Sequence, residues 1–202
     1  MGAIRDADWL VVGLGNPGSA YARTRHNVGF QVVERLAAEA RAHFRAGRFQ
    51  AQAASAELSG TLITLLKPRA FMNLSGLTVA AWLEAVGLPV RRLVVVHDDL
   101  DLPLGRLRVV RSAGPGGHRG VASVQETLGS QDFPRIRVGI GRPQEGQDAA
   151  DRVLEAFAPE ELPVVAEVVE RAAAAVRTLI RHGLASAMNR YNVRAHASGV
   201  SR

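Results

Sequence analysis

The sequence predicts an α/β fold, a single-domain sandwich in which helices flank a twisted, mostly parallel mixed sheet. Short apolar runs alternate along the chain with longer segments whose apolar residues recur at helical spacing, which is typical of this class. The 202 residues are 47% hydrophobic, enough for one full core but short for two. We therefore predict one domain over residues 1–193 and a flexible polar tail over 194–202.

Two strands and two helices are expected in the first half of the chain. Nearly all residues over 9–14 are apolar, which predicts a buried strand, and 28–40 carries one apolar stripe at helical spacing. A run of β-branched residues and leucines over 61–66 predicts another central strand. The helix predicted over 74–86 should stop at Gly87, because glycine commonly follows a helix C-terminus.

The second half is expected to add three strands. Apolar runs predict strands over 93–96 and 136–140, and basic and apolar residues alternate over 106–111. Since 106–111 follows 93–96 too closely for a crossover helix, part of the sheet should be antiparallel. The remaining expected elements are a glycine-rich loop, a short helix and a long helical region, over 112–120, 121–128 and 151–188 respectively.

Composition limits the chemistry and favours a polyanionic partner. Cysteine is absent, so there is no disulfide, thiolate zinc site or cysteine nucleophile. Acidic residues near the N-terminus argue against a secretory signal, and no apolar run is long enough to span a membrane, so we expect a cytoplasmic protein. The net charge of +6 and the pI near 11.0 are compatible with nucleic-acid binding.

Polar side chains gather in three segments that follow predicted strands, over 13–27, 71–76 and 97–101. In open α/β sheets, ligands bind where the strands end, so these segments should converge on one edge of the sheet. The side chains with useful chemistry are Asn16, His26, Asn73 and Asp98.

Three other kinds of site fit poorly. The first segment matches the dinucleotide pattern G-x-G-x-x-G, but the helix does not open at the third glycine, and the acid expected on the second strand is missing. The residues over 97–101 include several metal ligands, but alternation along a strand would separate His97 from Asp98. No G-x-S-x-G motif exists to expose a serine nucleophile.

The remaining residues suit hydrolysis by an activated water molecule. His26 can accept a proton near neutral pH, and Asp98 can orient its ring and stabilise the imidazolium. Asn16 and Asn73 can each offer an amide N–H to a carbonyl oxygen and an amide C=O to a substrate N–H. Each residue taken alone also has a non-functional explanation. His26 could be a surface residue, and the asparagines could be turn residues.

Together, these motifs resemble those of bacterial-type peptidyl-tRNA hydrolases, in matching order from Val11 to about Pro143. Tyr21 also matches the pattern of this family. The matching segments are Gly13-Leu14-Gly15-Asn16-Pro17-Gly18, Thr24-Arg25-His26-Asn27, Phe71-Met72-Asn73-Leu74-Ser75-Gly76, His97-Asp98-Asp99-Leu100-Asp101, Gly116-Gly117-His118 and Arg137-Val138-Gly139-Ile140-Gly141-Arg142-Pro143.

The resemblance implies an esterase that cleaves the bond between peptide and tRNA in peptidyl-tRNA released from ribosomes, which recycles the tRNA. It implies a monomer with no cofactor and no metal, acting on the acceptor stem, the CCA end and the nascent peptide. His26, Asp98 and Asn16 would be catalytic. The implied substrate-binding residues are Tyr21, Met72, Asn73, Gly116, His118 and Arg119.

One position departs from the family pattern. Where the family usually has Gly-His-Asn-Gly, this chain has Gly117-His118-Arg119-Gly120, so a small amide becomes a long cation that accepts no hydrogen bond. We expect Arg119 to contact RNA phosphate or the C-terminal side of the peptide.

Three arginines, Arg108, Arg111 and Arg137, are expected to bind tRNA phosphate. The resemblance places Arg108 and Arg137 near the 5′ phosphate, and Arg111 stands beside Val110, where some relatives carry lysine. A solvated strand face is the simpler explanation for each arginine alone. The functional alternatives are a non-catalytic RNA-binding protein on the same fold and a nucleotide-dependent enzyme that uses the glycine loop.

Overall fold

The strands of the central sheet lie in the order β2-β3-β4-β1-β5-β7-β6. In the computed structural model, which describes residues 7–143 and 145–192, neighbours from β4 to β7 run parallel, whereas β2, β3 and β6 pair antiparallel. The mixed, mostly parallel α/β sheet is therefore confirmed. The strands are β1 (Trp9–Gly13), β2 (Arg45–Ala46), β3 (Ala51–Leu58), β4 (Thr61–Pro68), β5 (Leu93–Asp99), β6 (Leu107–Val110) and β7 (Arg135–Gly139).

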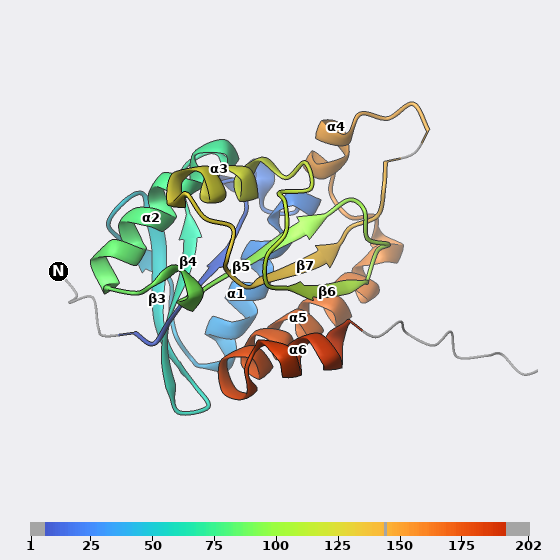
Figure 1. Ribbon diagram of the computed structural model, residues 1–202. Helices are drawn as coiled ribbons and strands as arrows, with labels where there is room; N and C mark the ends of the chain where they lie inside the picture. Colours follow the sequence, from blue (N-terminus) through green and yellow to red (C-terminus); the bar gives the residue numbers. More distant parts are fainter. Residues whose placement is uncertain (1–6, 144, 193–202) are drawn as a thin grey trace, which may run out of the picture.

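Helices cover both faces of the sheet (Figure 1). On one face lie α1 (Val28–Glu39), α5 (Leu162–His182) and α6 (Leu184–Tyr191), and on the other lie α2 (Ser75–Val86) and α3 (Arg119–Leu128). Alternate residues of each central strand enter the two cores, which explains why β1 and β5 are apolar along their whole length up to His97. The helix α4 (Ala149–Leu154) stands beyond the ends of β5 and β7.

The structure differs from the sequence prediction in three places. The helical region over 151–188 is broken by Pro159 and Gly183 into α4, α5 and α6, because proline opens a new helix and Gly183 has a φ of 83°. The strands β2 and β3 were not predicted, since β2 is only two residues long and the alanine-rich sequence of β3 has weak β-propensity. The strand β5 includes His97, Asp98 and Asp99, which were expected in a loop.

Gly13 of β1 and Gly29 of α1 permit close packing between this strand and this helix. A Cβ on Gly13 would lie 2.2 Å from the carbonyl oxygen of Gly29, and a Cβ on Gly29 would lie 2.5 Å from that of Leu14. Both approaches are too short for any side chain, so helix and strand meet backbone to backbone. This packing explains the first glycine of the motif, Gly13, without a nucleotide phosphate.

None of the helices within the described ranges combines the length and hydrophobicity needed to cross a membrane. The tail predicted over 194–202 lies outside the described residues.

Candidate active site

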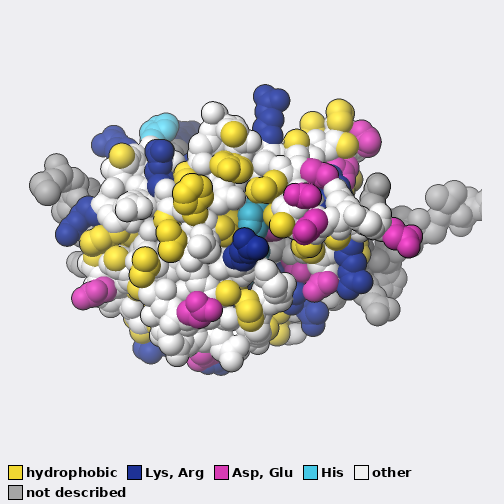
Figure 2. Space-filling view, turned by 90° about the horizontal axis from the view of Figure 1, so that it is seen from above, with side chains coloured by type: hydrophobic (Ala, Val, Ile, Leu, Met, Phe, Trp, Pro, Cys, Tyr) yellow, Lys and Arg dark blue, Asp and Glu magenta, His cyan; other side chains and the backbone are white. Residues whose placement is uncertain are grey.

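A cavity of about 620 Å³ opens where β1, β5 and β7 end. All three polar segments singled out in the sequence contribute to its wall, so they converge as expected. Figure 2 shows hydrophobic, basic and acidic side chains around a histidine near the middle of this face. The predicted site residues that line the cavity are Asn16, His26, Met72, Asn73, Asp98, Gly116, His118, Arg119 and Arg137.

His26 and Asp98 form a buried hydrogen-bonded pair. The short 3-10 helix η2 (Arg25–Asn27) carries His26 to the end of β5, where its Nδ1 lies 2.8 Å from Oδ1 of Asp98. His26 is 9% exposed and Asp98 is 2% exposed. Since the carboxylate only accepts, Nδ1 donates, and in the neutral ring Nε2 keeps the lone pair of a base.

His118 binds the same carboxylate oxygen of Asp98. Its Nε2 lies 2.9 Å from Oδ1 of Asp98, and its Nδ1 accepts from the backbone N–H groups of Gly120 and Val121, at 3.1 and 3.2 Å. Because Nδ1 accepts two hydrogen bonds, the ring proton is on Nε2 and points at Asp98. The side chain of His118 thus has two roles: it caps the N-terminus of α3, and it orients Asp98.

The two histidines keep Asp98 ionised. Burial alone would raise the pKa of Asp98, but the charge interactions with His118 and His26 and the hydrogen bonds from both rings lower it well below its usual range. Burial lowers the pKa of the neighbouring His97 well below its ordinary value, so this ring stays neutral. Asp98 therefore remains a carboxylate, placed to stabilise a proton on His26.

Hydrogen bonds fix the backbone of Asn16 and orient its side-chain amide. Its backbone N–H donates to Oδ1 of Asn27 at 2.8 Å, and Nδ2 of Asn27 donates back to the carbonyl of Asn16 at 3.0 Å. The backbone N–H of Met72 donates to Oδ1 of Asn16 at 3.2 Å. With Oδ1 engaged, Nδ2 is the group that Asn16 can offer to a bound carbonyl oxygen.

The side chains of His26, Asp98 and His118 are also close enough together to be considered as metal ligands, since one atom from each lies within 4.8 Å of the others. Their hydrogen bonds argue against this use. The lone pair on Nδ1 of His118 is taken by two backbone donors, and its Nε2 carries a proton. A metal would have to break this network to gain three ligands.

The predicted phosphate-binding arginines lie in different environments. Arg137 of β7 lines the cavity, and its Nε donates to Asp99. Arg108 is exposed on β6 and stands directly opposite Arg137 in the strand register. Arg111 is exposed and pairs with Asp132 at 2.8 Å. Among the described residues, the cavity wall does not include Arg108, Arg111 or Tyr21, which is half-buried in η1 (Ser19–Tyr21).

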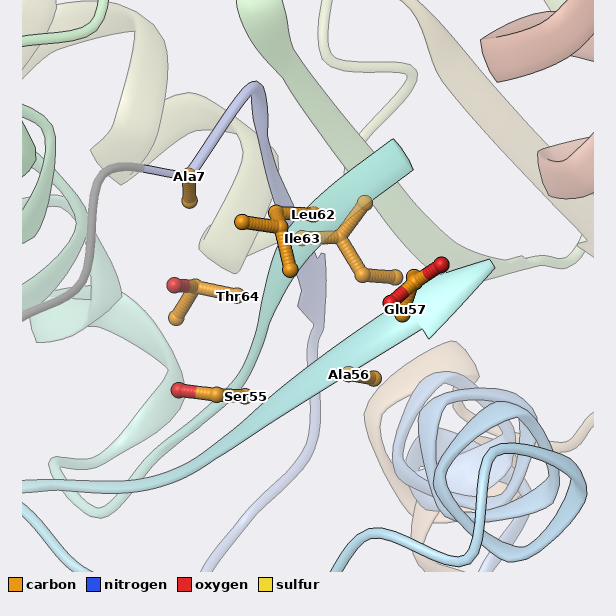
Figure 3. Close-up of a pocket in the computed structure, with 7 residues that line it drawn as sticks. All are labelled: Ala7, Ser55, Ala56, Glu57, Leu62, Ile63 and Thr64. Carbon is orange, nitrogen blue, oxygen red and sulfur yellow. The ribbon is translucent and has the colours of Figure 1, made fainter. Parts of the chain in front are cut away.

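A second, smaller cavity of about 170 Å³ lies beside the β3–β4 hairpin (Figure 3). The hydroxyl groups of Ser55 and Thr64 point to one side, and Glu57 lies at the other end. No histidine is among the described residues that line it, so it lacks the histidine–aspartate pair of the larger cavity. Its lining residues are Ala7, Ser55, Ala56, Glu57, Leu62, Ile63 and Thr64.

Comparisons with known proteins point to one family. The model of the peptidyl-tRNA hydrolase family matches residues 10–199. A peptidyl-tRNA hydrolase of Chloroflexus aggregans is 48% identical over 91% of this chain and 98% of its own length, and one of Frankia casuarinae is 46% identical over 93% and 95%. The crystal structure of the Acinetobacter baumannii peptidyl-tRNA hydrolase superposes with a TM-score of 0.87 at 31% identity, covering 95% of this chain and 98% of that one. This chain belongs to the peptidyl-tRNA hydrolase family.

Proposed function

We propose that this protein hydrolyses the ester bond between peptide and tRNA in peptidyl-tRNA, with His26 as the general base. The observation that carries the proposal is the pair of His26 and Asp98, which leaves Nε2 of His26 as a free base at the wall of a large cavity. Family membership supplies the substrate class.

In the proposed reaction, Nε2 of His26 takes a proton from water as the water oxygen attacks the ester carbonyl carbon. Asp98 stabilises the imidazolium that forms. The tetrahedral intermediate then expels the 3′-terminal oxygen of the tRNA, which receives the proton from His26. The products are a peptide with a free carboxyl group and a tRNA with a free hydroxyl group, and no acyl-enzyme forms.

We assign the oxyanion contact to Nδ2 of Asn16, because its Oδ1 is already used by Met72. Asn73 is exposed on the short helix η3 (Met72–Leu74) and lines the cavity, where it can bind the peptide backbone. His118 then supports Asp98, since both its ring nitrogens are bonded within the protein. Arg119 is exposed at the start of α3 and lines the same cavity, so it can reach phosphate or peptide.

For the tRNA, we propose that Arg108 and Arg137 hold a phosphate of the acceptor stem while the CCA end enters the cavity. Two like charges directly opposite on neighbouring strands repel each other, and a bound anion removes that cost. Arg111 contributes less, because it lies outside the cavity wall and both Nε and Nη2 of its guanidinium donate to Asp132, whereas Arg137 lines the cavity and donates to Asp99 through Nε. Tyr21 as a substrate contact, the monomeric state and the cytoplasmic location stay predictions.

A non-catalytic RNA-binding protein would not need this arrangement. Asp98 is buried as a carboxylate under two histidines, whose hydrogen bonds offset the cost of burying its charge. RNA binding alone requires basic side chains at the surface, not a buried acid beneath an imidazole.

The activity is tested by incubating the protein with N-acetyl-aminoacyl-tRNA and, separately, with the same tRNA carrying a free aminoacyl group. We expect rapid release of tRNA from the first substrate only, because the cavity is proposed to bind a peptide-like amide beside the ester. Binding of both RNAs without cleavage of either would instead support the non-catalytic alternative.

Arg108→Ala should weaken tRNA binding and reduce its salt dependence. Loss of one phosphate contact is expected to lower the slope of log Kd against log salt concentration by about one unit. The slope is measured by filter binding over a range of salt concentrations. Arg181→Ala, a change on the far end of α5, is the matched control, and an equal slope in both variants would contradict the assignment of Arg108.

A further inference from the structure

Arg25, the residue before His26, forms a buried ion pair that the proposed reaction does not use. Arg25 is 3% exposed, and its Nη1 and Nη2 donate to the two carboxylate oxygens of Glu161, at 3.1 and 2.5 Å. Such a bidentate contact fixes both the distance between the two side chains and their relative orientation, because the planar guanidinium matches the planar carboxylate. The pair therefore joins η2 rigidly to η5 (Pro159–Glu161).

Further contacts hold the same arginine in place. Its Nη1 also lies 3.4 Å from the carbonyl oxygen of Ile140, just after β7, and its guanidinium carbon lies 4.7 Å from the ring centre of Phe157. Its backbone N–H donates to Glu155 at 2.9 Å. Arg25 thus ties the helix that carries His26 to the end of β7 and to residues 155–161.

Residues 155–161 lead directly from the wall of the cavity. They follow α4, whose Val153 and Leu154 line the cavity. Within α4, Arg152 contacts Glu155 at 2.9 Å and Glu161 at 3.9 Å. Glu161 also accepts from the backbone N–H of Ala158 at 2.8 Å. The carboxylate of Glu161 is therefore the point where η2, α4 and η5 meet.

We infer that the Arg25–Glu161 ion pair is a positioning unit that holds the ring of His26 and the α4 wall of the cavity in one frame. A peptide that packs against α4 is then held at a set distance from the base. Without the pair, η2 can shift relative to α4, and a displacement of about 1 Å is enough to cost roughly a hundredfold in rate. The inference rests on the proposed function, in which His26 is the base.

The test compares Arg25→Met with Arg177→Met. Arg177 forms an ion pair with Glu39 between α5 and α1, away from the cavity, so its loss reports only on general stability. We expect Arg25→Met to lower kcat by roughly tenfold to a hundredfold with a smaller change in KM. Arg25→Lys should lie in between, because lysine keeps the charge but not the fork.

A second measurement separates positioning from stability. The proton on Nδ1 of His26 gives an NMR signal that depends on its hydrogen bond to Asp98. The signal should shift or broaden in Arg25→Met and stay unchanged in Arg177→Met. If Arg25→Met does not fold, Glu161→Gln takes its place, since glutamine keeps the shape and still accepts from Ala158.

An unchanged signal together with a kcat equal to that of Arg177→Met would overturn the inference. The spectrum needs no substrate. If the unaltered protein failed to cleave peptidyl-tRNA, the proposed function would fall, and the spectrum would still decide whether Arg25 positions His26.

Discussion

Replacing His26 with alanine is expected to lower kcat for peptidyl-tRNA by at least about a hundredfold, the usual contribution of a general base. KM should change little, because His26 acts on water and the proposed substrate contacts come from other residues. Both constants are measured from initial rates of tRNA release over a range of substrate concentrations.

The matched control is His43→Ala, which removes an exposed histidine that does not line the cavity. It should behave like the unaltered protein. If His26→Ala retained most of its activity while His43→Ala did as well, His26 could not be the base.

Asp98→Asn is expected to lower kcat by on the order of a hundredfold to 10⁴-fold, the range seen when a carboxylate that supports a catalytic histidine is neutralised. Asparagine keeps the size of the side chain but removes the charge that stabilises the imidazolium. His118→Asn is the comparison, since asparagine is a good helix N-cap and preserves the start of α3 while withdrawing from Asp98. It should lose much less activity than Asp98→Asn, and the reverse order would contradict the roles assigned here.

Asp98→Asn also tests whether the carboxyl group of Asp98 is ionised. In the folded protein its pKa lies below the unfolded value of about 3.9, so the carboxylate contributes stability above that pH. This contribution is lost as the pH falls below about 4, where the unfolded chain binds the proton first. The free energy of unfolding, measured with denaturant at several pH values, should decrease less on acidification for Asp98→Asn than for the unaltered protein.

Much of the fold could be predicted because its signals are local. The central strands are apolar along most of their length, since both faces of the sheet are covered, and Gly87 ends α2 where the sequence indicated. The strand β3 could not be found in this way. Its alanines have little β-propensity, and the strand exists because it pairs along its whole length with β4.

The sequence predicted the pairing of His26 with Asp98 but not the other connections of the candidate site. His26, Asp98 and Asn16 stand out by residue type at strand ends, and family motifs contain them. The pairing of His118 with Asp98, by contrast, depends on where α3 begins, and that of Arg25 with Glu161 joins residues far apart in the chain. Asn27, which holds the backbone of Asn16, belonged to a recognised motif but had no assigned role.

The direct attack of water on the ester can be measured in a single experiment. N-acetyl-aminoacyl-tRNA is cleaved in water enriched in ¹⁸O, and the products and the protein are weighed by mass spectrometry during turnover. We expect the label in the carboxyl group of the acylated amino acid, none in the tRNA, and an unchanged protein mass. A transient increase in protein mass by the acyl group, or label in the tRNA hydroxyl, would contradict attack by a water molecule activated by His26.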